Sequence, residues 1–274
     1  MLNHFTYFKP QTESELLEKI KSYGKDAKVL AGGTDLLIYM KQGIAAPQVL
    51  IDVKGIFEYS KIITASDGSI TIGASVTCND VIENECINKH FPVLAEAAKT
   101  LGSYQLRNRA TVVGNICNAS PAADMAGPLL VLGASVLAGN ESGEREILLK
   151  DFFLGVKKNA LKIGEFVKAI KVPAYFRDAK SGYIKASRIK GHDLGICNVA
   201  MCRVNGTLKF SIGSCAITPV LLPDFDSIKI YNKLVIDTAL KSINPIDDIR
   251  GSKDYRKHLV KVFINRLLEK GNSH

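Results

Sequence analysis

A chain of 274 residues with 46% hydrophobic residues can hold two modest domains and is too apolar to be disordered. No stretch approaches the about 18 apolar residues of a membrane span, and the first ten residues do not resemble a signal peptide, so we expect a cytoplasmic protein. The net charge of +9 comes from scattered basic residues, which argues against nucleic-acid binding and favours an anionic cofactor or acidic partner subunits.

The N-terminal part is predicted to alternate short strands with short helices. Thr12 is typical of a helix N-cap with Glu15 in the capping-box position, and Gly24 ends that helix. Asp67-Gly68 lies between two apolar runs, as in a β-hairpin turn. We expect a strand over 5–10, a helix over 12–24, a strand over 28–31, a helix over 36–41, a strand over 49–53, hairpin strands over 62–65 and 69–73, and helices over 79–88 and 92–101.

The pattern changes beyond Pro173, where strands follow one another before the last helices. Asn205-Gly206 is a strong hairpin signal in this part of the chain. We expect strands over 134–138 and 144–149, a helix or turn at 151–153, strands over 165–172, 182–187, 200–204, 207–212 and 214–217, and helices over 229–242 and 253–269. The break near 173–180 separates a mixed α+β part from a part made of a sheet and helices.

Two glycine-rich runs carry the functional signal. Residues 31–36 read Ala-Gly-Gly-Thr-Asp-Leu, and the second run covers residues 111–124. Neither fits the P-loop or the dinucleotide fingerprint, but glycine allows close approach of the backbone, and successive N–H groups in such turns bind anions. Thr34, Asn115 and Asn118 add side-chain donors. The runs predict a pyrophosphate-bearing cofactor held between them, and the alternative is that both are ordinary tight turns.

The cysteines show neither a C-x-x-C motif nor a Cys/His cluster with metal-ligand spacing. In a cytosolic chain they are expected to be reduced and mostly buried. We therefore expect no metal and no iron–sulfur cluster in this chain itself. The six residues are Cys78, Cys86, Cys117, Cys197, Cys202 and Cys215.

Several motifs resemble those of one family, the FAD-binding medium subunits of molybdenum hydroxylases of the xanthine dehydrogenase and carbon monoxide dehydrogenase type. Residues 31–37 and 111–115 resemble its two flavin-binding loops, and residues 118–124 extend the second loop to an Asp beside the flavin. Residues 183–194 are similar to the segment beside the isoalloxazine ring, and residues 245–256 resemble a D-x-R-G-S-x-x-Y-R motif. The four motifs stand in the family order and cover nearly the whole chain.

The resemblance implies an α+β protein with a two-subdomain FAD-binding fold, similar to vanillyl-alcohol oxidase, and then a small antiparallel sheet with helices. It implies an FAD-binding domain over 1–175 and a C-terminal domain of the carbon monoxide dehydrogenase flavoprotein type over 176–274. The implied function is electron transfer as an oxidoreductase subunit, from a [2Fe–2S] small subunit through FAD to NAD or another acceptor. Molybdopterin belongs in a large partner subunit, and this chain itself has no catalytic residue and no metal.

The resemblance also implies how the site is divided. The first run wraps the pyrophosphate, Leu101 packs near the adenine, and Lys185 lies near the flavin ring, where a cation stabilises reduced flavin. Alternatively, Lys185 is a surface lysine and Asp124 caps the following helix. The implied cofactor-binding residues are Val29, Leu30, Ala31, Gly32, Gly33, Thr34, Asp35, Leu36, Leu101, Thr111, Gly114, Asn115, Asn118, Asp124, Val167 and Lys185.

The chain departs from the family pattern in two places. Asp35 stands where some relatives have Glu or Ser, and residues 188–193 are longer and less acidic than in animal dehydrogenases, so a nicotinamide acceptor does not carry over. His192 and Asp193 are candidates for admitting the acceptor or are plain loop residues. Two other functions remain open, a flavin-free scaffold subunit and a stand-alone flavin oxidoreductase.

Overall fold

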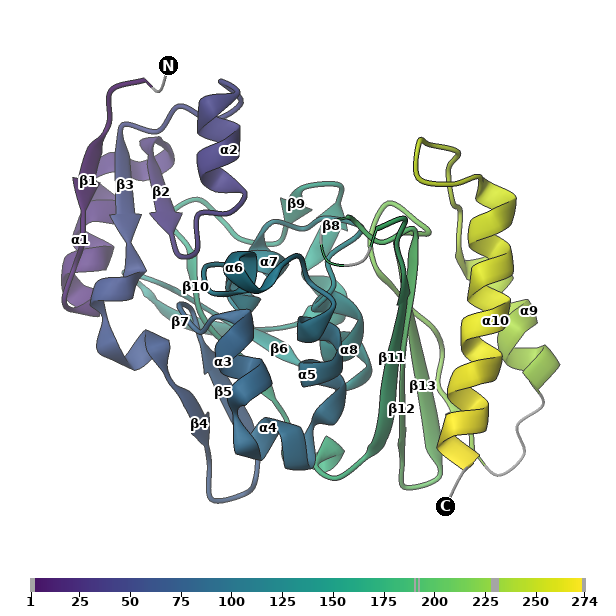
Figure 1. Cartoon of the computed structure of the whole chain (residues 1–274). Helices are drawn as coiled ribbons and strands as arrows, with labels where there is room; N and C mark the ends of the chain where they lie inside the picture. The colour runs from purple at the N-terminus through teal and green to yellow at the C-terminus, as the bar shows by residue number, and fades with distance from the viewer. Residues whose placement is uncertain (1–2, 190, 192, 228–231, 273–274) are drawn as a thin grey trace.

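The computed structural model describes residues 3–189, 191, 193–227 and 232–272, arranged in three parts side by side (Figure 1). The first is a small parallel sheet in the order β1-β3-β2, with α1 and α2 beside it. Thr12 accepts a hydrogen bond from the Glu15 N–H, and Glu15 accepts one from the Gln11 N–H, so the predicted cap at the start of α1 is confirmed. The elements are β1 (Thr6–Phe8), α1 (Glu13–Tyr23), β2 (Ala27–Leu30), α2 (Leu36–Lys41) and β3 (Val49–Asp52).

The second part is an antiparallel sheet in the order β4-β5-β10-β6-β7, covered by short helices. Its strands are β4 (Ile62–Thr64), β5 (Ile70–Gly73), β6 (Ser135–Asn140), β7 (Gly143–Leu148) and β10 (Phe166–Val172), and a hairpin of β8 (Phe153–Gly155) and β9 (Lys158–Asn159) lies beside it. Its helices are α3 (Cys78–Glu83), α4 (Glu85–His90), α5 (Pro92–Lys99), α6 (Tyr104–Arg107), α7 (Val112–Cys117) and α8 (Ala126–Val131). Short 3-10 turns occupy Gly24–Asp26, Val53–Gly55, Phe57–Ser60, Leu149–Asp151 and Ala174–Phe176.

The third part is an antiparallel sheet with helices on both faces. Alternate residues of a strand point to opposite faces, so Ala200 and Cys202 join the core under α5 and α8, while Val199 and Met201 join the core under α9 and α10 (Figure 1). Its elements are β11 (Lys180–Ala186), β12 (Cys197–Val204), β13 (Thr207–Gly213), β14 (Val220–Leu221), β15 (Phe225–Asp226), α9 (Asn232–Ser242) and α10 (Lys253–Asn272). Among the helices so described, none is long and apolar enough to cross a membrane.

Most expected elements are present, but three expectations are wrong. The helix expected over 79–88 is two helices, because Asn84 is extended and its side chain accepts the Ile87 N–H to cap α4. The strand expected over 214–217 is a series of bends, since Ser214 has φ +64° and donates its N–H to the Pro121 carbonyl instead of to a strand. The second glycine-rich run is not simply a loop, because α7 forms inside it.

The D-x-R-G-S-x-x-Y-R motif holds the C-terminal sheet to α10. Arg256 is completely buried and donates to the carbonyls of Ile196 and Ser214, at 2.6 and 2.9 Å, and to Asp248 at 2.7 Å. Arg250 pairs with the same carboxylate at 2.6 Å. The motif is therefore structural, and none of its described residues lines the cleft described next.

Candidate functional site

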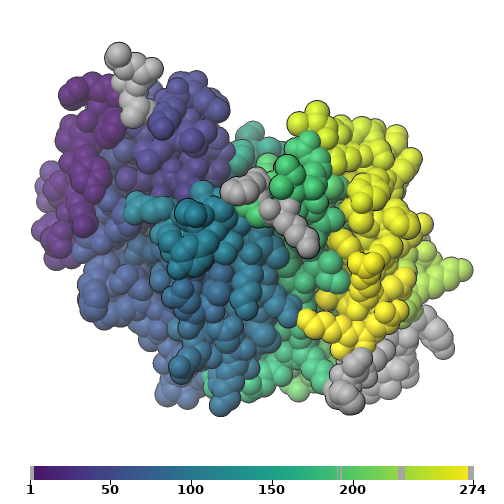
Figure 2. Space-filling view, viewed as in Figure 1, coloured from purple at the N-terminus to yellow at the C-terminus, as the bar shows by residue number. Residues whose placement is uncertain are grey.

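A large open cleft lies where the first part of the fold meets the second. Its volume is about 1160 Å³, which exceeds the roughly 300–1,000 Å³ typical of sites for drug-sized ligands. In the space-filling view the surface is hollowed on the side of the first part that faces the rest of the chain (Figure 2). The cleft is lined by segments within 20–53, 101–124, 157–167 and 193–194, and by Ala74. Both glycine-rich runs therefore form its walls.

The first run follows β2 and packs directly on residues 109 and 110, which lead into the second run. A Cβ atom on Gly32 would lie 1.9 Å from the Arg109 carbonyl oxygen, so no larger residue fits without moving the backbone. Gly33 has φ +75°, a conformation that favours glycine. The sequence folds here as a sharp strand-to-helix turn because both positions are glycine.

The backbone N–H groups of this run are available to a ligand. The Gly33 and Asp35 carbonyls accept from the N–H groups of Leu37 and Tyr39, which fixes the turn. Within the described part of the chain, the N–H groups of residues 32–35 have no acceptor. Buried or half-buried N–H groups are normally satisfied, so four adjacent ones facing a cleft are suited to an anion.

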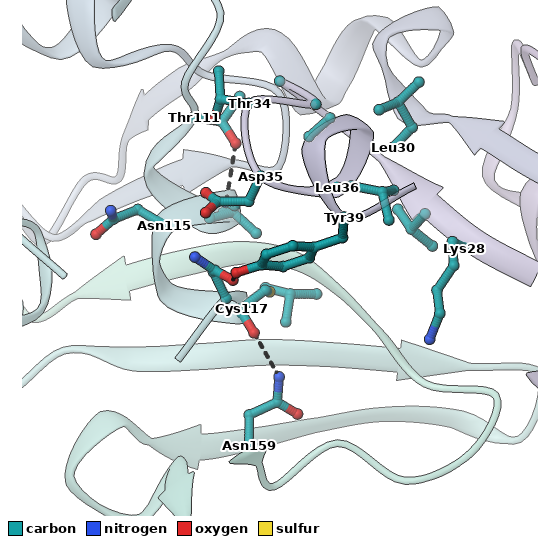
Figure 3. A pocket seen from close by; sticks show the side chains of 18 of the residues that line it. Lys28, Leu30, Thr34, Asp35, Leu36, Tyr39, Thr111, Asn115, Cys117 and Asn159 are labelled. Carbon is teal, nitrogen blue, oxygen red and sulfur yellow. Dashed lines mark hydrogen bonds between the residues drawn. The ribbon is translucent and has the colours of Figure 1, made fainter. Parts of the chain in front are cut away.

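The second run forms the opposite wall through α7. The Thr111 hydroxyl accepts the Gly114 N–H at 2.9 Å and caps the helix, while Asn115 Oδ1 accepts the Met125 N–H at 3.1 Å. The Asn115 side chain is thereby held in place with its NH₂ group still able to donate. Asn159 Nδ2 donates to the Cys117 carbonyl at 2.8 Å and ties the β8–β9 hairpin to this wall (Figure 3).

Tyr39 connects the two walls and was not anticipated from the sequence. It projects from α2 across the cleft, and its hydroxyl lies 3.2 Å from Asn118 Oδ1 (Figure 3). The Lys157 ammonium lies 5.4 Å from the centre of its ring. The available signal was the helical spacing, because a residue three positions after Leu36 lies on the same helix face.

Asp124 lies at the inner end of the cleft in a buried ion pair. Lys185 Nζ lies 2.8 Å from Asp124 Oδ2 and donates to the Thr100 carbonyl at 3.1 Å, and the Tyr183 hydroxyl donates to Asp124 Oδ1 at 3.0 Å. Both charged side chains are at least nine-tenths buried. Burial raises the pKa of Asp124, and Lys185 and Tyr183 oppose that shift. Asp124 does not cap α8, and Lys185 is not a surface lysine, so both simpler alternatives are wrong.

The charges left unpaired around the cleft are mainly positive. Of its five carboxylates, Asp124, Glu165 and Asp193 are held in ion pairs with Lys185, Arg145 and Arg188. The other two, Asp26 and Asp35, have no cationic partner in the part of the chain that the structure describes. Four lysines line the cleft without a carboxylate partner among the described residues, and all four are exposed. They are Lys25, Lys28, Lys157 and Lys162. An anionic ligand would meet a net positive surface.

The structure brings together all the site residues expected from the sequence except one. Lys185 is not part of the lining and contacts the cleft through Asp124. Leu101 and Val167, which come from separate elements, do line it. Asp193 lies at the rim and pairs with Arg188 at 2.7 Å, whereas His192 lies outside the described residues.

Known proteins of one family match almost the whole chain. Residues 3–175 match the family described as the FAD binding domain in molybdopterin dehydrogenase. The glyceraldehyde dehydrogenase medium chain of Sulfolobus acidocaldarius is 30% identical, over 94% of this chain and 95% of the relative. The xanthine dehydrogenase FAD-binding subunit of Escherichia coli O157:H7 is 28% identical, over 98% of this chain and 96% of the relative.

The solved structures give the same result for the fold. A chain of carbon monoxide dehydrogenase from Hydrogenophaga pseudoflava superposes with a TM-score of 0.91 at 28% identity, covering 99% of this chain and 98% of that one. The expected α+β FAD-binding fold is confirmed.

Proposed function

Since this chain belongs to the family of FAD-binding subunits of molybdenum hydroxylases, we propose that it is the electron-transfer subunit of such an oxidoreductase. In this role it takes electrons from a [2Fe–2S] partner and passes them to NAD or another acceptor. FAD is the cofactor of the family. When bound, it supplies a carrier that accepts and releases electrons, while the protein supplies binding, orientation and electrostatics.

The observation that carries the proposal is the set of N–H groups at residues 32–35 that have no acceptor in the described part of the chain. They lie opposite α7 in a cleft of net positive charge. A pyrophosphate offers several acceptor oxygens and negative charge at close spacing, which this wall can match. The large cleft volume leaves room for a dinucleotide beyond the phosphates. The residues present therefore fit FAD.

Each wall has a distinct task in this proposal. Residues 29–36 hold the pyrophosphate and ribityl chain by backbone donors, and Thr111, Gly114 and Asn115 form the second clamp. Asn118 donates to or accepts from the ribityl and flavin groups, and the Asp124 carboxylate accepts from them. Leu101 and Val167 pack on apolar parts of the cofactor. Lys185 acts through Asp124, whose carboxyl group it holds in place.

Partners, compartment and domain limits belong to the same proposal. The relatives are named as medium chains or FAD-binding subunits, so we assign a molybdopterin-binding large subunit and a [2Fe–2S] small subunit as partners. The six cysteines form no disulfide, and this favours a reducing cytoplasm. The FAD-binding domain is proposed over 1–175 and the C-terminal domain over 176–274.

The test is an absorption spectrum of the purified chain after incubation with FAD and desalting. We expect the visible flavin bands to remain with the protein. The FAD-loaded chain is then reduced chemically under argon and mixed with NAD or an artificial acceptor, and return of the flavin bands identifies the acceptor. A folded, colourless chain would instead favour a scaffold that has lost its flavin, and retained flavin that no acceptor reoxidises would contradict electron transfer.

A further inference from the structure

A charged cluster behind the first glycine-rich run lies outside the cleft. Asp52 ends β3 and is 3% exposed, and Lys54 follows it. Lys54 Nζ lies 2.6 Å from Asp52 Oδ1, and the Tyr7 hydroxyl donates to Asp52 Oδ2 at 2.5 Å. Asp52 and Lys54 do not line the cleft, so a direct contact with a ligand there is not their task.

The cluster reaches the run at one atom. Lys54 Nζ also donates to the carbonyl oxygen of Ala31 at 2.7 Å. The contact follows from the sheet, because β2 and β3 are parallel neighbours in which Leu30 pairs with Asp52, so both strands end at the same edge. The first residue after β2 and the cluster after β3 are thereby side by side.

By holding the Ala31 carbonyl, Lys54 also orients the N–H group of Gly32. The Ala31 carbonyl and the Gly32 N–H belong to one planar trans peptide, in which the C=O and N–H bonds point in opposite directions. Holding the oxygen toward Lys54 therefore turns the Gly32 N–H away from the cluster. That N–H group has no acceptor among the described residues, and Gly32 lines the cleft.

We infer that Lys54, held by Asp52, is a positioning residue that orients the Ala31–Gly32 peptide so that its N–H faces the cofactor phosphate. Glycine makes such a device useful, because a Gly-Gly segment has unusual backbone freedom and could turn this peptide over. Burial would raise the pKa of Asp52, but hydrogen bonds from Lys54 and Tyr7 outweigh it and keep the pKa below its usual value. Asp52 is therefore charged when Lys54 binds it. The inference rests on the proposed FAD site.

The test compares FAD dissociation constants, measured by flavin fluorescence, for the full-length wild type and the Lys54→Met variant. We expect roughly tenfold weaker binding, the size of one lost charge-assisted hydrogen bond. Because Lys54→Met leaves Asp52 buried without its cation, the Asp52→Asn/Lys54→Met double variant is measured as well. The double variant should regain thermal stability, because no buried carboxylate is left without its cation. It should not regain FAD affinity, because the Ala31 carbonyl still lacks its hydrogen bond from Lys54.

Salt dependence separates orientation from simple attraction. Because Lys54→Met leaves the Asp52 carboxylate uncompensated, the salt comparison uses the Asp52→Asn/Lys54→Met double variant, which keeps the net charge unchanged. Its loss of FAD affinity should be nearly the same at low and high salt. The matched control is Lys28→Met, which removes an exposed cleft lysine without a described partner, and its loss should shrink as salt rises. A double variant that binds FAD as tightly as wild type, or a double-variant loss that disappears in salt, would overturn the inference. A wild-type chain that binds no FAD would instead refute the proposed function.

Discussion

Replacing Gly32 by alanine should weaken FAD binding about tenfold to 100-fold, the range expected when a close-packed contact is overfilled. The new methyl group would lie 1.9 Å from the Arg109 carbonyl oxygen, so the two walls must separate or the run must move. Either movement misplaces the N–H groups of residues 32–35. The measurement is a fluorescence titration of FAD against the folded variant, with folding checked by circular dichroism.

The matched control for this substitution is Gly155→Ala. Gly155 lies in β8 outside the cleft lining, and a Cβ atom there meets only the end of the Lys158 side chain, at 4.0 Å. It should bind FAD like the wild type. Unchanged FAD affinity in Gly32→Ala would contradict the placement of the pyrophosphate at the first run.

Replacing Lys185 by methionine should lower the free energy of unfolding by about 3–5 kcal/mol, because removing one partner leaves a buried charge uncompensated. The group left behind is the Asp124 carboxylate, whose remaining side-chain partner among the described residues is the Tyr183 hydroxyl. The measurement is urea unfolding of wild type and variant. The Asp124→Asn/Lys185→Met double variant should recover most of the loss, and equal losses in the single and double variants would show that the ion pair is not the cause.

The loss in Lys185→Met should also depend on pH. Burial already raises the pKa of Asp124, and removing Lys185 takes away an opposing influence. The Asp124 carboxyl has its ordinary pKa in the unfolded chain and a higher pKa in the folded variant. At a pH between these two values the folded state binds one more proton than the unfolded state, so the free energy of unfolding falls as pH rises. The difference from wild type should therefore be larger near about pH 8 than near about pH 5. A difference independent of pH would argue against an unpaired carboxylate.

The parts of the fold that could be predicted from the sequence are those governed by neighbouring residues. The Thr12 cap, the Asp67-Gly68 turn and the two glycine-rich runs each depend on residues a few positions apart. Ser214 was misassigned because its N–H bonds to Pro121, far away in the chain, and no local pattern reports that contact.

The same distinction applies to the site. Nearly all the residues expected at the site line the cleft, but the partners that hold those residues could not be predicted from the sequence. Tyr39 meets Asn118 and Lys54 meets Ala31 only after distant segments come together. Lys185 lies behind Asp124 and pairs with its carboxyl group, a contact between residues 61 positions apart. Such pairs follow from packing, which sequence spacing does not encode.

The most direct measurement is a crystal structure of the full chain loaded with FAD. We expect the pyrophosphate to lie against residues 32–35, with its oxygens within hydrogen-bonding distance of at least two of those N–H groups, and α7 to lie on the opposite side. A pyrophosphate bound instead to the four exposed lysines of the cleft, with residues 32–35 not contacting the cofactor, would contradict the proposal that the two glycine-rich runs form the cofactor clamp.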